Sequence, residues 1–296
     1  MECMIKNALL PSLLLLCVGG AAHAFDLGQE LKKAIEQDTE QQTEPGRPQS
    51  GTGGGISVGD VRGLLGFSLE EEVAIGRQAA GNLLGAAPPV RNAKLQKYVN
   101  NVGRWVASQG ERPDLDWHFG VIESNDINAF AAPGGYVFVT KGLYRLLQSE
   151  SELAGVLAHE IGHVIAQHHL KILQQSQLLG LGGKLLAETA GEYQVVQNLI
   201  GNGAEIFARS LDKNAEYEAD RMAVILAARA GYDPFGLPTV LQDIGHAAKD
   251  DSSVKLLFKT HPHPDDRLAH LGDAVDDRLD RLKGQTLEKR FYRIKP

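Results

Sequence analysis

The five residues His159-Glu160-Ile161-Gly162-His163 constrain this chain more than any other stretch, because they follow the pattern H-E-x-x-H. On a helix, side chains four positions apart lie on one face, so His159 and His163 can point at one metal ion. Zinc binds histidine nitrogens at roughly 2.0–2.1 Å. Glu160 lies about 100° round the helix, where a general base for a metal-activated water is expected. The stretch therefore predicts a helix that carries a hydrolytic metal site.

The third metal ligand must come from elsewhere, because a catalytic zinc ion usually has three protein ligands and a water. Glu216 and Asp220 share one helix face in the same way as the two histidines. A carboxylate from Glu216 would complete a His₂Glu site. Asp220 would accept the free ring N–H of a ligating histidine and fix its tautomer. Glu218 falls on the opposite side of that helix, and we expect it to be solvated.

His169 is the rival third ligand. It occupies the last position of H-E-x-x-H-x-x-G-x-x-H, the metzincin pattern. That pattern needs a glycine, which lets the backbone turn toward the metal, where this chain has Ala166. Ala166 favours continuation of the helix, which would carry His168 and His169 past the site. We therefore favour Glu216, with the metzincin arrangement as the alternative.

Residues 1–24 predict a signal peptide. Lys6 precedes an apolar stretch too short to span a bilayer, and Ala22-His23-Ala24 matches a cleavage site. The two cysteines, Cys3 and Cys17, lie in this segment, so the mature chain would have no disulfide. These features suit an exported, periplasmic protein of a bacterium. A retained anchor and a lipoprotein signal ending at Cys17 are the less favoured alternatives.

The rest of the chain predicts one domain with appendages. Residues 25–60 comprise a polar, helix-prone segment and a linker rich in glycine and proline, for which we expect disorder. Residues 61–283 would form the catalytic domain and residues 284–296 a C-terminal tail. The amphipathic stretch 170–207 suggests either a lid, helices packed over the site, or ordinary surface helices.

Hydrophobic residues make up 43% of the 296 residues, which suits a globular domain of moderate size. The net charge is −7 and no basic stretch occurs, so nucleic-acid binding is not expected. After the predicted signal no stretch reaches 18 apolar residues, and no transmembrane helix is expected.

Hydrophobic periodicity and capping signals predict an α+β chain that is mostly helical. Ser68 with Glu71, and Ser149 with Glu152, are capping boxes that would begin two helices, the second carrying the histidines. Strict alternation predicts a half-buried strand. The expected strands cover 115–121 and 136–140, and the remaining helices cover 90–108, 214–230, 234–247 and a last segment beginning at Pro264.

Several motifs lie in a fixed order between about residues 65 and 275. They are Asp126-Ile127-Asn128-Ala129-Phe130-Ala131, Gly134-Gly135-Tyr136-Val137-Phe138-Val139, His159 to His163, Glu216 to Asp220, Gly231-Tyr232-Asp233-Pro234, and Thr260-His261-Pro262 with Arg267. In this order they resemble the zinc metallopeptidase family that includes HtpX, the CAAX prenyl endopeptidase and the periplasmic beta-barrel assembly-enhancing protease. Together they are far more specific than H-E-x-x-H alone.

The resemblance implies a gluzincin fold with an active-site helix and a small antiparallel or mixed sheet. It implies one zinc ion per chain, held by His159, His163 and Glu216, with Glu160 as the general base. The strand Gly135-Tyr136-Val137-Phe138 would be the sheet edge that binds substrate backbone by β-augmentation. We expect neither the transmembrane helices of the membrane-embedded members nor the helical-repeat domain of the assembly-enhancing protease.

The stretch Thr260-His261-Pro262-His263-Pro264 contains prolines that block regular helix. The resemblance implies that His261 lies near the zinc ion. There it would act either as a latch on the fourth coordination site or as a donor to the developing oxyanion. The alternative is a plain exposed turn, which we favour for His263. Arg267 is expected to anchor this loop to a carboxylate such as Asp220.

These expectations combine into an exported zinc-dependent endopeptidase that acts in envelope protein quality control and outer-membrane assembly. Its partners would be protein or peptide substrates, chiefly misfolded envelope proteins, with peripheral membrane contact left open. Two alternatives stand beside this prediction. One is an envelope chaperone or assembly factor with weak or latent proteolysis, and the other is a metallohydrolase for a non-peptide amide.

Overall fold

The computed structural model describes residues 66–175, 211–246, 252–275 and 281–293. The predicted signal peptide (1–24), the predicted linker segment (25–60) and most of the stretch 170–207 lie outside the described residues. Those three expectations therefore stay predictions. Among the helices that the structure describes, none combines the length and the apolar character needed to cross a membrane.

Two helices begin where their capping boxes predict. Helix α3 (Leu69–Ala86) starts after Ser68, whose Oγ accepts the N–H of Glu71 at 3.2 Å while the Glu71 side chain accepts the Ser68 N–H at 2.7 Å. Helix α6 (Glu150–Ile165) starts after Ser149, whose Oγ accepts the N–H of Glu152 at 3.2 Å. Both satisfy backbone donors that a helix N-terminus otherwise leaves unpaired.

The longer helices predicted from periodicity are also present, with small differences at their ends. They are α4 (Ala93–Ala107), α10 (Lys213–Arg229), α11 (Gly236–Gly245) and α13 (Pro264–Val275). Helix α10 stops before Gly231, whose φ of 86° favours glycine. Three short elements escaped prediction because each is too short for a helical period to show. They are α5 (Lys141–Leu146), the 3₁₀ turn η1 (Ser252–Val254) and α12 (Lys255–Thr260).

The sheet has three described strands in the order β1-β3-β2. Strand β1 (His118–Ile122) runs parallel to β3 (Tyr136–Thr140), with His118 opposite Tyr136. Strand β2 (Ala129–Ala132) runs antiparallel to β3, with Ala132 opposite Tyr136. The periodicity did not predict β2, because four residues dominated by alanine carry little β propensity.

Strand β3 is central, so the prediction that Gly135 to Phe138 forms an edge of the sheet is wrong. Gly134 and Gly135 have φ values of 74° and 98°, which allow the tight turn between β2 and β3. The turn folds β2 onto one side of β3, while β1 occupies the other side. Among the described strands, β1 and β2 therefore form the two edges of the sheet.

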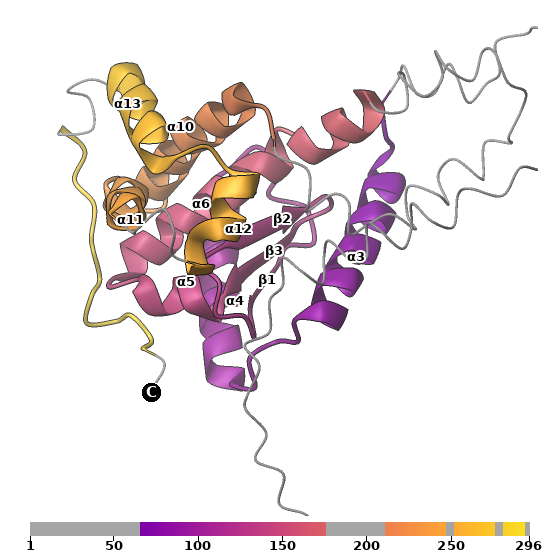
Figure 1. The fold of residues 1–296 in the computed structure, drawn as a ribbon, viewed down its shortest axis with the longest axis horizontal. Coiled ribbons are helices and arrows are strands. Elements are labelled where there is room, and N and C mark those ends of the chain that lie inside the picture. The colour runs from indigo at the N-terminus through magenta and orange to yellow at the C-terminus, as the bar shows by residue number, and fades with distance from the viewer. Residues whose placement is uncertain (1–65, 176–210, 247–251, 276–280, 294–296) are drawn as a thin grey trace, which may run out of the picture.

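Both faces of the sheet are covered (Figure 1). Phe119, Val121 and Val137 belong to a core shared with α4 and α6, whereas Ile122 and Phe138 pack with residues of α3. Four of the five β1 residues are consequently buried. The predicted alternation holds as far as Phe119, with Asp116 and His118 exposed, and fails at Gly120, which is buried. An alternating sequence pattern does not reveal that α3 covers the second face of the sheet.

Helix α6 lies at the centre of the domain. All its residues from Glu150 to Val164 are buried, as is typical of a helix that packs against neighbours on every side. Glycines allow neighbouring helices to approach it closely. A Cβ atom at Gly155 would lie 2.5 Å from the nitrogen of Leu237 in α11, and one at Gly162 would lie 3.3 Å from the Cα of Ala219 in α10. The second contact brings α10 against the H-E-x-x-H turn.

The segment predicted as a C-terminal tail packs on the domain as far as the structure describes it (Figure 1, yellow trace). Phe291 is buried in the main core, and the hydroxyl of Tyr144 donates to the carbonyl of Tyr292. The Nε of Arg290 donates to Glu150 Oε2 at 2.8 Å. The chain end is thereby tied to the first turn of the active-site helix.

Candidate metal centre

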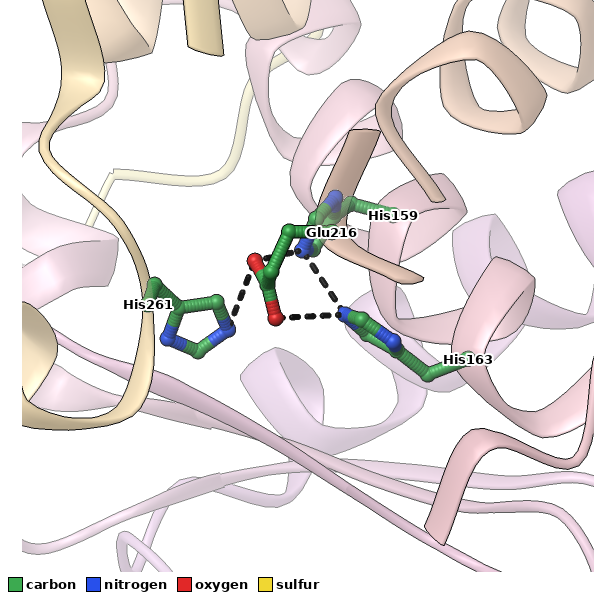
Figure 2. A group of neighbouring side chains, drawn as sticks. All are labelled: His159, His163, Glu216 and His261. Atoms are coloured by element: carbon green, nitrogen blue, oxygen red, sulfur yellow. Dashed lines mark hydrogen bonds and ion pairs between the residues drawn. The ribbon is translucent and has the colours of Figure 1, made fainter. Parts of the chain in front are cut away.

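Four side chains from three parts of the chain converge at one point (Figure 2). Helix α6 supplies His159 and His163, α10 supplies Glu216, and the loop between α12 and α13 supplies His261. One ligand atom from each of the four lies within 4.8 Å of the others, and all four residues are buried. The structure thus brings together the three predicted metal ligands and the predicted loop histidine.

The spacing of the three predicted ligands suits a zinc ion. The Nε2 atoms of His159 and His163 are 3.0 Å apart. Glu216 Oε1 lies 3.5 Å from His163 Nε2, and Oε2 lies 3.6 Å from His159 Nε2. Tetrahedral bonds of about 2.0–2.1 Å separate neighbouring ligand atoms by about 3.3 Å. The two nitrogens and the Glu216 carboxylate, which presents one oxygen to each of them, therefore have the spacing that a zinc site requires.

Glu216 provides an independent test of whether a cation belongs here. Its side chain is 0% exposed, and neither carboxylate oxygen has a hydrogen-bond partner among the described residues. Burial raises the pKa of Glu216, but the neighbouring His261, His159 and Arg267 outweigh this and lower the pKa to about 2. A buried carboxylate without donors is costly unless a cation neutralises it. Two imidazoles and this carboxylate fit zinc.

Asp220 contacts the ring nitrogen of His159 that faces away from Glu216. This nitrogen, Nδ1, lies 2.9 Å from Asp220 Oδ1, which directs Nε2 toward Glu216. Arg267 in turn holds Asp220, with Nε 2.9 Å from Oδ2 and Nη2 2.6 Å from Oδ1. Burial raises the pKa of Asp220, but the charge of Arg267 reverses that effect and keeps the carboxyl ionised. The predicted contacts of Asp220 with a histidine of the pair and with Arg267 are both present.

His163 has a different neighbour, which the sequence did not reveal. Its Nδ1 lies 2.9 Å from the Nδ1 of His168. The prediction that the helix continues through Ala166 is wrong. Helix α6 ends at Ile165, and Gln167 turns the backbone with a left-handed φ of 55°. The turn occurs without the glycine of the metzincin pattern, one residue later than that pattern requires.

His169, the rival ligand, lies close to the site without joining it. Its ring centroid is 6.0 Å from that of His163, and it lines the same small pocket. The convergent group of ligand atoms contains Glu216 and His261 rather than His169. Glu218 was expected to be solvated; its side chain is 49% exposed, yet its Oε2 lies 3.4 Å from His168 Nε2.

Glu160 and His261 face each other across the site. Glu160 is buried, and its Oε1 lies 4.0 Å from His261 Nε2, which lies 3.9 Å from Glu216 Oε2. Burial is the main reason that the pKa of Glu160 rises to about 7 and that of His261 falls to about 4. Both border a small pocket that is lined by residues of strand β2 and of three other segments. The lining residues are Ala129, Phe130, Ala131, Glu160, His163, His169, Leu211, Thr260 and His261.

This combination of fold and site defines a class of protein. A buried H-E-x-x-H helix that meets a glutamate on a second helix, with a further carboxylate beside it, is the arrangement of zinc metallopeptidases. The chain belongs to peptidase family M48, whose family model matches residues 93–275. The zinc metallopeptidase family and the mostly helical fold with a small mixed sheet, both expected from the sequence, are confirmed.

Bacterial and mitochondrial proteases are among the similar proteins. The chain is 31% identical to the beta-barrel assembly-enhancing proteases of Yersinia pestis and Escherichia coli over 230 residues, which is 75% of this chain. It is 31% identical over 182 residues to the mitochondrial metalloendopeptidase OMA1 of Arabidopsis thaliana, covering 61% of this chain and 36% of that protein. The matched part spans 46% and 45% of the two bacterial relatives, less than half of each.

Proposed function

We propose that this chain is a zinc-dependent endopeptidase in which His159, His163 and Glu216 hold one zinc ion. The observation that carries the proposal is Glu216, whose buried and unpartnered oxygens lie 3.5 and 3.6 Å from the two histidine nitrogens. When bound, the zinc ion would polarise the scissile carbonyl and lower the pKa of a coordinated water toward about 7.

Glu160 is the proposed general base. It follows His159 directly on α6, is buried, and borders the same pocket as His163 and His261. Its carboxylate would accept a proton from the attacking water and later donate that proton to the leaving amine. A single side chain next to the cluster can serve both steps because neither requires it to bind the metal.

His261 has two proposed roles, and its position close to both Glu216 and Glu160 suits each of them. Its Nε2 lies 3.9 Å from Glu216 Oε2 and 4.0 Å from Glu160 Oε1. As a latch, it would take the fourth position of the metal site and exclude the attacking water. As an oxyanion donor, it would give its N–H to the tetrahedral intermediate.

For substrate binding we now propose β2 in place of β3. Ala129 and Ala131 of β2 line the pocket that contains Glu160 and His261, whereas no residue of β3 does. An extended peptide alongside β2 would pass directly beside the proposed base. This mode of recognition uses main-chain pairing, which tolerates many substrate sequences.

The biological setting is proposed from the relatives and from the predicted signal peptide. We infer a periplasmic protease that acts on misfolded envelope proteins, because two bacterial relatives are named beta-barrel assembly-enhancing proteases. The second candidate is an assembly factor with latent proteolysis, which the closeness of His261 to the metal ligands favours. Rescue of a deletion strain by Glu160→Gln as well as by wild type would favour the assembly factor.

Metal analysis and casein digestion of the purified chain test the proposal. We expect one zinc ion per chain, casein cleavage that a chelator abolishes and added zinc restores, and sharp zinc loss in His159→Ala, His163→Ala and Glu216→Ala. His169→Ala is the matched control and should retain zinc. Full zinc retention in Glu216→Ala together with loss in His169→Ala would favour the metzincin arrangement instead.

A further inference from the structure

The two histidines of the H-E-x-x-H motif are supported in different ways. His159 Nδ1 contacts the carboxylate of Asp220, whereas His163 Nδ1 contacts another imidazole, that of His168, at 2.9 Å. Both rings of the second pair are buried, with His168 4% exposed. A hydrogen bond between two ring nitrogens requires one to donate and the other to accept. The direction of this bond therefore defines the tautomers of both rings.

The position of His163 fixes that direction. Its Nε2 faces the Nε2 of His159 and Oε1 of Glu216, which is where a metal ion would bind. A nitrogen that binds a metal needs its lone pair, so the ring hydrogen of His163 must be on Nδ1. That N–H therefore donates to His168 Nδ1, which must itself be unprotonated.

The contact between His168 and Glu218 agrees with this direction of the hydrogen bond. If His168 Nδ1 accepts, the hydrogen of this ring is on Nε2, and that atom lies 3.4 Å from Glu218 Oε2. Glu218 is half exposed and offers an acceptor at this distance. The hydrogen bonds then all run one way, from His163 to His168 and from His168 to Glu218.

A backbone turn at Gln167 places His168 beside His163. Gln167 has a φ of 55°, and its Nε2 donates to Glu72 Oε2 at 3.1 Å. Glu72 is buried, and it also accepts a bidentate contact from Arg112 at 2.9 Å and the N–H of Gly134 at 3.0 Å. An unfavourable backbone conformation persists only where the surroundings hold it. The turn is thus tied to α3 and to the turn between β2 and β3.

We propose that His168 is a positioning residue for the metal site: its Nδ1 accepts the Nδ1–H of His163 and so keeps the Nε2 lone pair of His163 directed at the metal ion. The proposal rests on the proposed function, in which His163 is a zinc ligand. Glu218 acts one step further out by holding the His168 tautomer. Loss of an outer hydrogen bond of this kind typically weakens metal binding about 10–100-fold.

Zinc affinity, measured by competition with a chromophoric chelator, tests the proposal in three variants. His168→Leu removes the acceptor and should raise the Kd for zinc about 10–100-fold. His168→Asn offers an amide oxygen near the position of Nδ1 and should restore most of the affinity. His169→Leu, a matched change at the neighbouring histidine, which does not bond to His163, should leave the affinity unchanged. Circular dichroism in chelator checks that each variant is folded.

Long-range proton–nitrogen NMR spectra of the wild-type, zinc-loaded chain give a test that needs no variant to fold. We expect hydrogen on Nδ1 of His163 and on Nε2 of His168. Hydrogen on Nδ1 of His168, or equal zinc affinity in wild type and folded His168→Leu, overturns the inference alone. Failure of the wild-type chain to bind zinc overturns the proposed function, and the inference falls with it.

Discussion

The guanidinium of Arg267 contacts the carboxylate of Asp220 at two points, with Nε 2.9 Å from Oδ2 and Nη2 2.6 Å from Oδ1. The same Oδ1 lies 2.9 Å from His159 Nδ1. All three side chains are buried. Helix α13, far from the H-E-x-x-H motif in sequence, is therefore connected to it through the Asp220 carboxylate of α10, and Arg267 Nη2 itself lies 3.2 Å from His159 Nδ1.

This connection predicts that Arg267→Met is strongly destabilising. Removing one partner of a buried ion pair leaves the other uncompensated and typically costs about 3–5 kcal/mol. Urea unfolding should show a loss of that size, and zinc affinity should fall because Asp220 no longer holds His159. The double variant Arg267→Met with Asp220→Asn should recover part of the stability, since it removes both charges of the pair. A loss below about 1 kcal/mol in Arg267→Met would contradict this account of the pair.

Glu160→Gln is expected to separate zinc binding from catalysis. The amide keeps the size and polarity of the side chain but cannot accept a proton. Zinc content and thermal stability should match those of the wild type, while casein cleavage should fall on the order of 10²–10⁴-fold. Activity within a few-fold of wild type, at equal zinc content, would remove Glu160 from the mechanism.

The features that the sequence predicted well are those decided within a few neighbouring residues. The N-caps at Ser68 and Ser149, the helical spacing of His159 and His163, and the glycine stop at Gly231 all depend on local geometry. The contact between α6 and α10 was inferred from chemistry, because a third ligand was required. Its physical basis is the small residue Gly162 against Ala219.

Features that depend on distant partners were missed. The family resemblance implied that β3 is an edge strand, and periodicity could not correct this, because it tells which face of a strand is apolar but not which strands lie beside it. The role of His168 depends on the turn at Gln167, which Glu72 holds from 95 residues away in the chain. Nothing in the sequence around Gln167 predicts its contact with Glu72. Ala166 favours a continuous helix instead of a turn.

His261→Ala distinguishes the two roles proposed for the loop histidine. A latch competes with the attacking water, so its removal should raise casein cleavage. An oxyanion donor stabilises the transition state, so its removal should lower turnover on the order of 10²–10³-fold. His263→Ala is the matched control, because that ring stacks on Phe258 and does not belong to the convergent ligand group. Unchanged activity and unchanged zinc binding in His261→Ala would exclude both roles.

The last prediction concerns acid stability and the packed C-terminal segment. Glu150 is buried in the first turn of α6 and accepts hydrogen bonds from Tyr98 and Tyr232, each at 2.8 Å, and from Arg290. Burial raises the pKa of Glu150, but the contacts with Arg290 and the two tyrosine hydroxyls outweigh it, and the pKa lies below its ordinary value. An ionised Glu150 thus stabilises the folded state above its unfolded pKa of about 4.3.

That stabilisation should be lost as the pH falls from about 4.3 toward the lower pKa of the folded state, because over this range the unfolded chain binds a proton that the folded protein does not yet hold. Glu150→Gln cannot titrate, so its unfolding free energy in urea should fall less steeply than that of the wild type over this range. Asp220 and Glu216 also have lowered pKa values and contribute to the slope in both proteins, so the difference between the two slopes is the quantity to measure. Glu288→Gln, an exposed change in the same C-terminal segment, serves as the control. Equal slopes for wild type and Glu150→Gln would mean that the contact between Arg290 and Glu150 does not anchor the chain end to the active-site helix.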